Sequence, residues 1–493
     1  MSIARSTLWQ MSSQVAMAAL SILTVKLVAV GLSKELAGNY HSAYSYLQIW
    51  GILADFGLYA VAVKEVSVAK NPERVLGTFL LLRSGIVLLA LGAALVIAWG
   101  IPLWRGTPLP LGISIAALVP FFTLLAGVFR VVFQVRHAMQ WVFSAEVISR
   151  IVTAICMLLL VLYGELRSTR TTDYYLFLGV GSLGAVALFI TSYVGARGII
   201  RIVPHTDFTE VRRVLALAIP YGIAFLFTAI YRQSDVTLIA LLRTDYELQN
   251  AEYGFALRAA EMAFLIPTYL LNATLPVLGA LGTKSQQGKK LLGKTLFALL
   301  ALGGSLALGS AILARPLMQL LTTEDYLSSP LAAGSDTALA LLAVPMFFNA
   351  IVQYCFYVLL MEHVWQPLVR SLGIGAALAT LANLYMVPRF GFVGACITSI
   401  AVHSILVVLL FPGTASRFPV ILPLWTVGKL CIFFLLITAF LLVVRPWMSS
   451  TLSTLLLLFP LGASAVLSFQ KTGCSAYLRS NGRDRNGMED VIE

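Results

Sequence analysis

Long apolar runs, each 19 to 29 residues in length, recur along nearly the whole chain, from Leu8 to Gln470. An α-helix needs about 20 apolar residues to cross the ~30 Å hydrocarbon core of a bilayer. Helices are favoured there because they satisfy their backbone polar groups within one segment. Only 11% of the residues are charged, whereas soluble domains carry about 25%. The sequence therefore predicts an all-α integral membrane protein without a sizeable soluble domain.

Fourteen membrane spans are expected from these runs. They begin near residues 8, 43, 80, 110, 146, 174, 215, 253, 294, 338, 367, 391, 423 and 450. An even number of spans places both termini on one side of the membrane. If the N-terminus is inside, the inner loops and tail carry 18 Lys and Arg residues and the outer loops carry eight. Since Lys and Arg accumulate in cytoplasmic loops, both termini are predicted to be cytoplasmic.

The basic inner loops explain most of the net charge of +12, so no nucleic-acid partner is needed to account for it. Basic segments beside a membrane are attracted to anionic headgroups. Membrane lipids are therefore the expected partners of these loops.

The two halves of the chain resemble each other. Val119-Pro120-Phe121-Phe122 in the fourth span is echoed by Val344-Pro345-Met346-Phe347 in the tenth, six spans later. A repeat separated by an even number of spans keeps its orientation, as in transporters whose lobes are related by an axis along the membrane normal. We therefore expect two pseudo-symmetric six-helix lobes around a central cavity, followed by two C-terminal helices. The predicted parts are residues 1–200, 201–412 and 413–470, with a disordered cytoplasmic tail at 471–493.

Six ionisable residues lie deep within the predicted spans. They are Lys26, Asp55, Arg232, Asp235, Arg258 and Glu261. A charge near the bilayer centre costs at least about 2.5–3.5 kcal/mol, so such groups usually face a bundle interior or a water-filled cavity. Arg232–Asp235 and Arg258–Glu261 are spaced i, i+3, so each pair shares a helix face and can partly neutralise itself. A shared cavity explains all six residues, and the alternative is structural ion pairing, with Asp55 as the partner of Lys26.

Cations outnumber anions among the ionisable residues of the spans, which suits an anionic ligand such as a phosphate group. Four of these cations lie near the predicted cytoplasmic ends of their spans, where long side chains can reach the headgroups. They are Arg83, Arg130, Arg150 and Arg370. Glu146 and Arg150, spaced i, i+4, are expected to pair on one helix surface.

The chain contains no P-loop, HExxH, CxxC or GxSxG motif, so neither an ATP motor nor a cofactor or metal centre is predicted. A membrane glycan polymerase or glycosyltransferase usually needs a large aqueous loop with catalytic residues. The longest predicted outer stretch runs only from about Arg315 to Thr337. A transporter rather than an enzyme is therefore expected.

Two segments carry a family resemblance. Leu32-Ser33-Lys34-Glu35-Leu36-Ala37-Gly38-Asn39-Tyr40, followed by Asp55-Phe56-Gly57-Leu58, is similar to the opening of bacterial polysaccharide transporters. Residues 383–399, beginning Asn383-Leu384-Tyr385-Met386-Val387-Pro388, resemble that family's N-x-x-x-(I/V)-P-x-(Y/F)-G-x-x-G-A signature. The chain departs from the first pattern where Leu32-Ser33 replaces Leu-Gly. The resemblance is to the oligosaccharide flippase branch of the multidrug/oligosaccharidyl-lipid/polysaccharide exporter superfamily.

This resemblance implies a protein of the bacterial cytoplasmic membrane that flips undecaprenyl-diphosphate-linked oligosaccharides by alternating access. It also implies a cationic cavity, to which Lys26, Arg232 and Arg258 would contribute by attracting the diphosphate. Asp55, Asp235 and Glu261 would hold these cations or relay coupling protons. A proton or sodium ion is the implied coupling ion, and polysaccharide polymerase machinery is an implied partner.

Two alternatives share the same fold. One is a cation-coupled drug or metabolite antiporter, in which the carboxylates would bind the substrate. The other is a flippase for a lipid-linked cell-wall precursor, which differs in the sugar rather than in the mechanism.

Overall fold

The computed structural model describes residues 17, 20–69, 71–136, 138–200, 208–420 and 424–448. Within this part of the chain the secondary structure is helical, apart from one isolated β-bridge between Leu32 and Ser168. An apolar helix covers Leu20–Gly31. The helices that follow are α2 (Lys34–Asp55), α3 (Leu58–Val68), α4 (Pro72–Gly100), α5 (Leu109–Ala116), α6 (Leu118–Val135), α7 (Met139–Tyr163), α8 (Thr171–Arg197), α9 (Phe208–Leu242), α10 (Tyr246–Leu281), α11 (Gln286–Ile312), α12 (Ala314–Leu321), α13 (Ser335–Met361), α14 (Trp365–Arg417) and α15 (Leu424–Val444).

The all-α membrane fold predicted from the sequence is confirmed, because ten segments of the described chain are long and apolar enough to cross a bilayer. Large apolar side chains on these helices are exposed, such as Leu89 and Val96 on α4 at 77% and 74%. Extensive exposed apolar surface is unusual for a soluble monomer and fits contact with lipid. The expected fourteenth span and the tail at 471–493 lie outside the described residues.

The 53-residue helix α14 contains the two spans expected at 367 and 391. Gly391 interrupts it with φ 58° and ψ −140°, a conformation accessible almost only to glycine. A Cβ built on Gly394 would lie 2.5 Å from the carbonyl oxygen of Met386. Residues eight positions apart in one straight helix are about 12 Å apart along the axis, so the chain reverses here.

Two other spans are broken in the middle for identifiable reasons. Pro120 has no N–H to bond to the carbonyl of Ala116, the residue at which α5 ends. Between α2 and α3, Phe56 and Gly57 adopt left-handed φ values of 40° and 72°. A Cβ on Gly57 would lie 2.5 Å from Cβ of Tyr221 in α9, so this break also permits a close helix contact.

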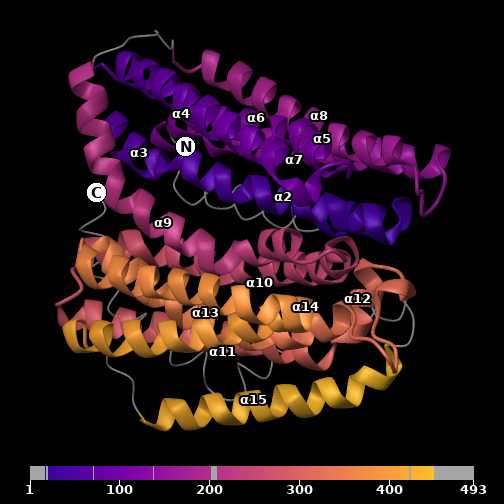
Figure 1. Cartoon of the computed structure of the whole chain (residues 1–493). Coiled ribbons are helices and arrows are strands. Elements are labelled where there is room, and N and C mark those ends of the chain that lie inside the picture. Colours follow the sequence, from indigo (N-terminus) through magenta and orange to yellow (C-terminus); the bar gives the residue numbers. More distant parts are fainter. Residues whose placement is uncertain are drawn as a thin grey trace. The chain divides into compact units, whose positions relative to one another are not determined.

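The described part of the chain forms two packing units. Of the described residues, the first contains those up to Phe255 together with 321–326 and 372–395. Figure 1 shows α4, α6, α7 and α8 side by side in it, and α6 and α7 both pack on α8. One core cluster joins α3, α4, α6 and α9 through Leu58, Phe79, Val131 and Val214.

The second packing unit contains residues 256–320, 327–371 and the described residues from Cys396 to Met448. In it α11 packs on both α13 and α15 (Figure 1). Phe297 and Ala301 of α11 form a core cluster with Phe433 and Leu441 of α15. The two pseudo-symmetric lobes expected from the sequence repeat, residues 1–200 and 201–412, stay a prediction.

Candidate functional site

Asp235 lies at the centre of a buried polar cluster in the first packing unit. Its side chain, on α9, is 2% exposed. The carboxylate accepts a 2.7 Å hydrogen bond from the Tyr253 hydroxyl on α10 and another of 2.7 Å from the Asn383 amide on α14. Both donors are neutral. No ion pair to Asp235 occurs among the described residues. Burying a carboxylate without a cationic partner is costly, so this site is suited to take up a proton or a cation.

The same cluster continues towards α2. Asn250 of α10 donates 2.9 Å hydrogen bonds to the Ser42 hydroxyl and to the carbonyl of Val236. Oxygen atoms of Asn250, Asn383 and Thr237 are buried and have no hydrogen-bond partner in the described part of the protein. An unpartnered buried acceptor costs about 1–3 kcal/mol. Three such oxygens in the segments around Asp235 add acceptor capacity that a donor or cation could use.

The first turns of α10 lie directly against α2. Asn39 donates a 2.8 Å hydrogen bond to Glu247 and accepts one of 3.0 Å from Tyr246. A Cβ on Gly38 would lie 1.7 Å from the Glu247 carbonyl oxygen, and a Cβ on Gly254 would lie 2.3 Å from the His41 ring. Small residues at membrane helix crossings allow such close backbone approach. The two glycines therefore hold the polar residues of α2 and α10 within hydrogen-bonding distance.

Replacing Gly38 with alanine should disrupt this crossing, because the new methyl group would overlap a backbone carbonyl that cannot rotate away. We expect a loss of about 1–3 kcal/mol in unfolding free energy, as for other overpacked sites. Thermal unfolding of the purified protein in detergent measures it. Gly85→Ala is the matched control, since a Cβ on Gly85 meets nothing within 4 Å. Equal stability of the two variants would contradict the close approach.

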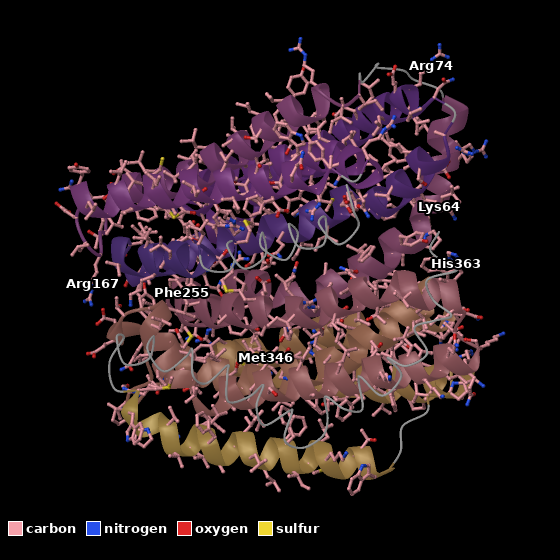
Figure 2. All side chains as sticks on the ribbon, turned by 180° about the vertical axis from the view of Figure 1, so that it is seen from behind. Lys64, Arg74, Arg167, Phe255, Met346 and His363 are labelled. Carbon is pink, nitrogen blue, oxygen red and sulfur yellow. The ribbon has the colours of Figure 1, made fainter. Side chains whose placement is uncertain are left out.

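A second polar group gathers where the chain segment 321–326 meets α2 and α10. Lys34, at the start of α2, forms a 2.5 Å ion pair with Glu252 and donates to the Asp325 carbonyl at 3.3 Å. Arg167 pairs with the Asp325 carboxylate at 2.7 Å. Figure 2 labels Arg167 and Phe255 near one end of this unit and Lys64 near the other. By the charge bias of the loops, the end with Arg167 is the predicted outer end.

Lys26 takes part in this outer group, since its ammonium donates a hydrogen bond to the carbonyl of Thr322. Asp55 does not pair with Lys26. The interpretation in which Asp55 is the ion-pair partner of Lys26 is therefore wrong. Asp55 pairs instead with Arg83 of α4. Its place beside the break between α2 and α3 puts it next to the core cluster of α3, α4, α6 and α9.

The expectation that Arg83 reaches the headgroups is wrong, because its side chain is only 5% exposed. A Cβ on Gly127 would lie 3.2 Å from its guanidinium, so the absence of a side chain at Gly127 makes room for Arg83. Helical spacing predicts the depth of Arg83 in the membrane but not the direction in which its side chain points.

Glu146 of α7, like Asp55, has an ion-pair partner on a different helix. It forms a 3.1 Å ion pair with Arg130 of α6.

The two i, i+3 pairs behave differently. Arg258 and Glu261 form a 2.9 Å ion pair on α10 and are 28% and 19% exposed. Arg232 and Asp235 do not pair, because Asp235 takes its hydrogen bonds from Tyr253 and Asn383. Arg232 is half-buried on α9. The structure thus brings Asp235 together with neutral residues, which are not among the charged residues predicted to form the site.

Tyr253 and Asn383 bond to Asp235 directly. Asn250 and Ser42 bond to each other, and Asn39 bonds to Glu247 and Tyr246 where α2 crosses α10. Amide side chains inside apolar runs were the available signal, since polar groups within a bilayer must find partners. For Asn383 the sequence also offers its place at the start of the family signature.

The turn between α9 and α10 fixes the outer end of this cluster. Arg243 donates to both Asp245 carboxylate oxygens, at 2.6 and 2.8 Å, and to the Pro388 carbonyl at 3.0 Å. The hydrogen bonds from Arg243 hold the pKa of Asp245 below its usual value. Gln249 accepts from the backbone N–H of Phe392 at 3.0 Å. These contacts place the turn of α14 at Gly391 against the start of α10 and so position Asn383 beside Asp235.

No group of three or more His, Cys, Asp or Glu side chains suited to hold a metal ion occurs in the described part of the chain. A site at Asp235 would therefore depend on one carboxylate supplemented by neutral oxygens. Such a donor set suits a proton or a weakly held cation rather than a resident transition metal.

Comparisons with known proteins agree with this fold. A family model described as "Polysaccharide biosynthesis protein" matches residues 3–281. A structure described as "Lipid II flippase MurJ, inward closed conformation" has a TM-score of 0.69 at 13% identity, covering 96% of this chain and 99% of that chain. An inward-facing multidrug resistance MATE family transporter of the MOP superfamily has a TM-score of 0.65 at 11% identity, covering 82% of this chain and 94% of that one. No curated protein matches the sequence.

Proposed function

Because the chain belongs to the polysaccharide biosynthesis protein family, we propose that it flips undecaprenyl-diphosphate-linked oligosaccharides across the bacterial cytoplasmic membrane. The family match carries this proposal, since it links a multi-pass membrane protein to glycan assembly. The structural similarity to a lipid II flippase and to MATE transporters supports transport by alternating access. Both termini are then cytoplasmic, as the loop charges predict.

Cationic side chains within the spans are proposed to bind the diphosphate. Lys26, Arg232 and Arg258 are the candidates, and guanidinium groups suit phosphate because they donate two parallel hydrogen bonds. Glu261 pairs with Arg258 at 2.9 Å and would orient it until the substrate arrives. The lipid chain needs no polar site, because it can stay in the bilayer while the sugar crosses.

Asp235 is the proposed coupling residue. A buried carboxylate with two neutral donors, at 2.7 Å each, gains stability when a proton or sodium ion neutralises it. Uptake of that ion would change the hydrogen bonds that connect α9, α10 and α14, which gives the ion a means to bias the conformation. Asp55 already pairs with Arg83, so its proposed role is structural.

Two other functions fit the same fold, and one experiment separates them from the proposal. Plasmids carrying the chain are introduced into strains that lack either the flippase for an O-antigen unit or the flippase for the cell-wall precursor. Restored surface polysaccharide supports the proposal. Rescue of only the cell-wall strain identifies the precursor flippase, and drug resistance without either rescue identifies the antiporter.

In the rescued strain, Arg232→Ala/Arg258→Ala should lower surface glycan about 100-fold or more. Charge-assisted hydrogen bonds contribute about 1.5–3 kcal/mol each, so the loss of two weakens diphosphate binding by at least that factor. Quantitative glycan staining measures it, with membrane levels of the protein followed in parallel. Arg170→Ala is the control, because Arg170 pairs with Glu165 and is 65% exposed. Unchanged glycan in the double variant would remove both arginines from the substrate site.

A further inference from the structure

A short segment, residues 321–326, packs in the first unit although the chain on both sides of it belongs to the second unit. We call this segment the strap. Within the first unit it contacts the apolar helix before α2, the start of α2 and the loop between α7 and α8. A movement of one unit against the other must therefore either break these contacts or deform the chain beside the strap.

Three cations hold the strap through its oxygen atoms. The Lys26 ammonium donates a hydrogen bond to the carbonyl of Thr322, and Lys34 donates one of 3.3 Å to the carbonyl of Asp325. Arg167, labelled in Figure 2, pairs with the Asp325 carboxylate at 2.7 Å. We call Lys26, Lys34 and Arg167 the strap cations. They come from three separate segments and converge on one short stretch of chain.

The strap supplies the kind of oxygen atoms that a phosphate group also has. Glu324 and Asp325 give it two carboxylates. A diphosphate esterified at both ends likewise carries one negative charge on each phosphate. Lys and Arg bind carboxylate and phosphate oxygens alike, through charge-assisted hydrogen bonds. A diphosphate could therefore take the place of the strap at the strap cations.

Release of the strap would remove these oxygen atoms. The ion pair of Arg167 with Asp325 would be lost, and Lys26 and Lys34 would each lose a carbonyl acceptor. Glu252 would stay beside Lys34, with which it pairs at 2.5 Å. The lost bonds must then be replaced by water or by an anion. A diphosphate at this point would offset the loss of the strap, whereas without an anion the return of the strap is favoured.

The strap is held by contacts that can be broken reversibly. The ring of Tyr326, 2% exposed, meets the ring of Phe255 edge-on at 5.0 Å. The buried Tyr326 hydroxyl has no hydrogen-bond partner within the described residues, and such a group weakens the state that buries it. Arg167 and Asp325 are 57% and 51% exposed, and exposed ion pairs are weak. A competing ligand can therefore displace the strap.

We propose that the strap cations form a binding site for the diphosphate of the substrate at the predicted outer end of the first unit, and that substrate and strap compete for it. Binding of the diphosphate releases the strap and permits opening to the outside. When the product leaves, the strap returns. This inference rests on the proposed transport of a diphosphate-linked oligosaccharide, and it adds Lys34 and Arg167 to the substrate-binding residues.

The test follows the position of the strap and the binding of the ligand separately. The full-length protein, with its own cysteines replaced by alanine, carries spin labels at Thr323→Cys in the strap and at Thr171→Cys on the exposed start of α8. It is placed in phosphatidylcholine nanodiscs. Double electron–electron resonance should show one label distance without ligand and a second, longer one with geranyl-diphospho-N-acetylglucosamine. Geranyl N-acetylglucosamine, which lacks the diphosphate, should leave the distance unchanged.

Substitutions on the two sides of the contact should change ligand affinity in opposite directions. Lys34→Gln/Arg167→Gln should bind the diphosphate ligand at least about tenfold more weakly, because charge-assisted hydrogen bonds are lost. Asp325→Asn should bind it about two- to fivefold more tightly, because an exposed ion pair that competes with the ligand is removed. Damage to the fold would weaken binding in both variants. Arg170→Gln is the matched control and should bind normally, since Arg170 is 65% exposed and pairs with Glu165.

Two results would overturn this site and leave the proposed function intact. One is an unchanged strap distance when the ligand binds the wild type, and the other is weaker binding by Asp325→Asn. Release of the strap by phosphatidylglycerol nanodiscs without added diphosphate would also overturn it, because a phospholipid headgroup would then be the ligand. No binding of the diphosphate to the wild type, together with no restored surface polysaccharide in the strain test, would instead remove the proposed function and this site with it.

Discussion

Asp235→Asn should reduce transport at least about 100-fold while leaving the protein folded in the membrane. The asparagine keeps the size of the side chain and can still accept a hydrogen bond from Tyr253. In the wild type the Tyr253 hydroxyl lies 2.7 Å from the carboxylate oxygen. It has no negative charge to bind a proton or cation. A coupling ion can shift an equilibrium only through its different affinity for the two states, so without this affinity the driving force is lost.

The measurement is uptake of a fluorescent lipid-diphosphate glycan into vesicles with an imposed proton or sodium gradient. We expect the variant to show the same slow rate with and without the gradient. Asp245→Asn is the control, because Asp245 is a 39% exposed carboxylate in the turn after α9. The transport rate of Tyr253→Phe should lie between the rates of these two variants, since this substitution removes one hydrogen-bond donor to Asp235 and keeps the carboxylate. Gradient-dependent transport by Asp235→Asn at the wild-type rate would exclude Asp235 as the coupling site.

Arg83→Met should lower the free energy of unfolding by about 3 kcal/mol. Removing one partner of a buried ion pair costs about 3–5 kcal/mol, because the other charge stays buried and unpaired. Asp55 is 31% exposed, which places the expected loss at the lower end of this range. Thermal unfolding in detergent gives the value. The reduced stability should appear even without substrate, which distinguishes this structural role from a role in binding.

A double-mutant cycle tests the pairing itself. Arg83→Met/Asp55→Leu should recover most of the stability lost by Arg83→Met, since apolar pairs often replace buried ion pairs at little cost. Arg150→Met is a suitable comparison for Arg83→Met, because Arg150 is also an arginine on a span near the same predicted membrane surface. Additive losses in the double variant would show that Asp55 and Arg83 do not interact.

The membrane spans could be predicted from the sequence because span length depends on local properties. A run of about 20 apolar residues must cross the bilayer whatever its neighbours are. The family was likewise readable from Asp55-Phe56-Gly57 and from the segment starting at Asn383. Even the reversal of α14 was expected, since separate spans were predicted to begin near residues 367 and 391.

The partners of the deep charges were decided only by tertiary structure. Asp235 and Asn383 are 148 residues apart, and Asp55 and Arg83 lie on different helices. Spacing along one helix predicted that Arg232 would pair with Asp235, yet packing turned Asp235 towards Tyr253 and Asn383 instead. Sequence position gives the depth of a side chain in the membrane, because each residue adds a fixed rise. The direction in which it points depends on how neighbouring helices pack, and this required the folded structure.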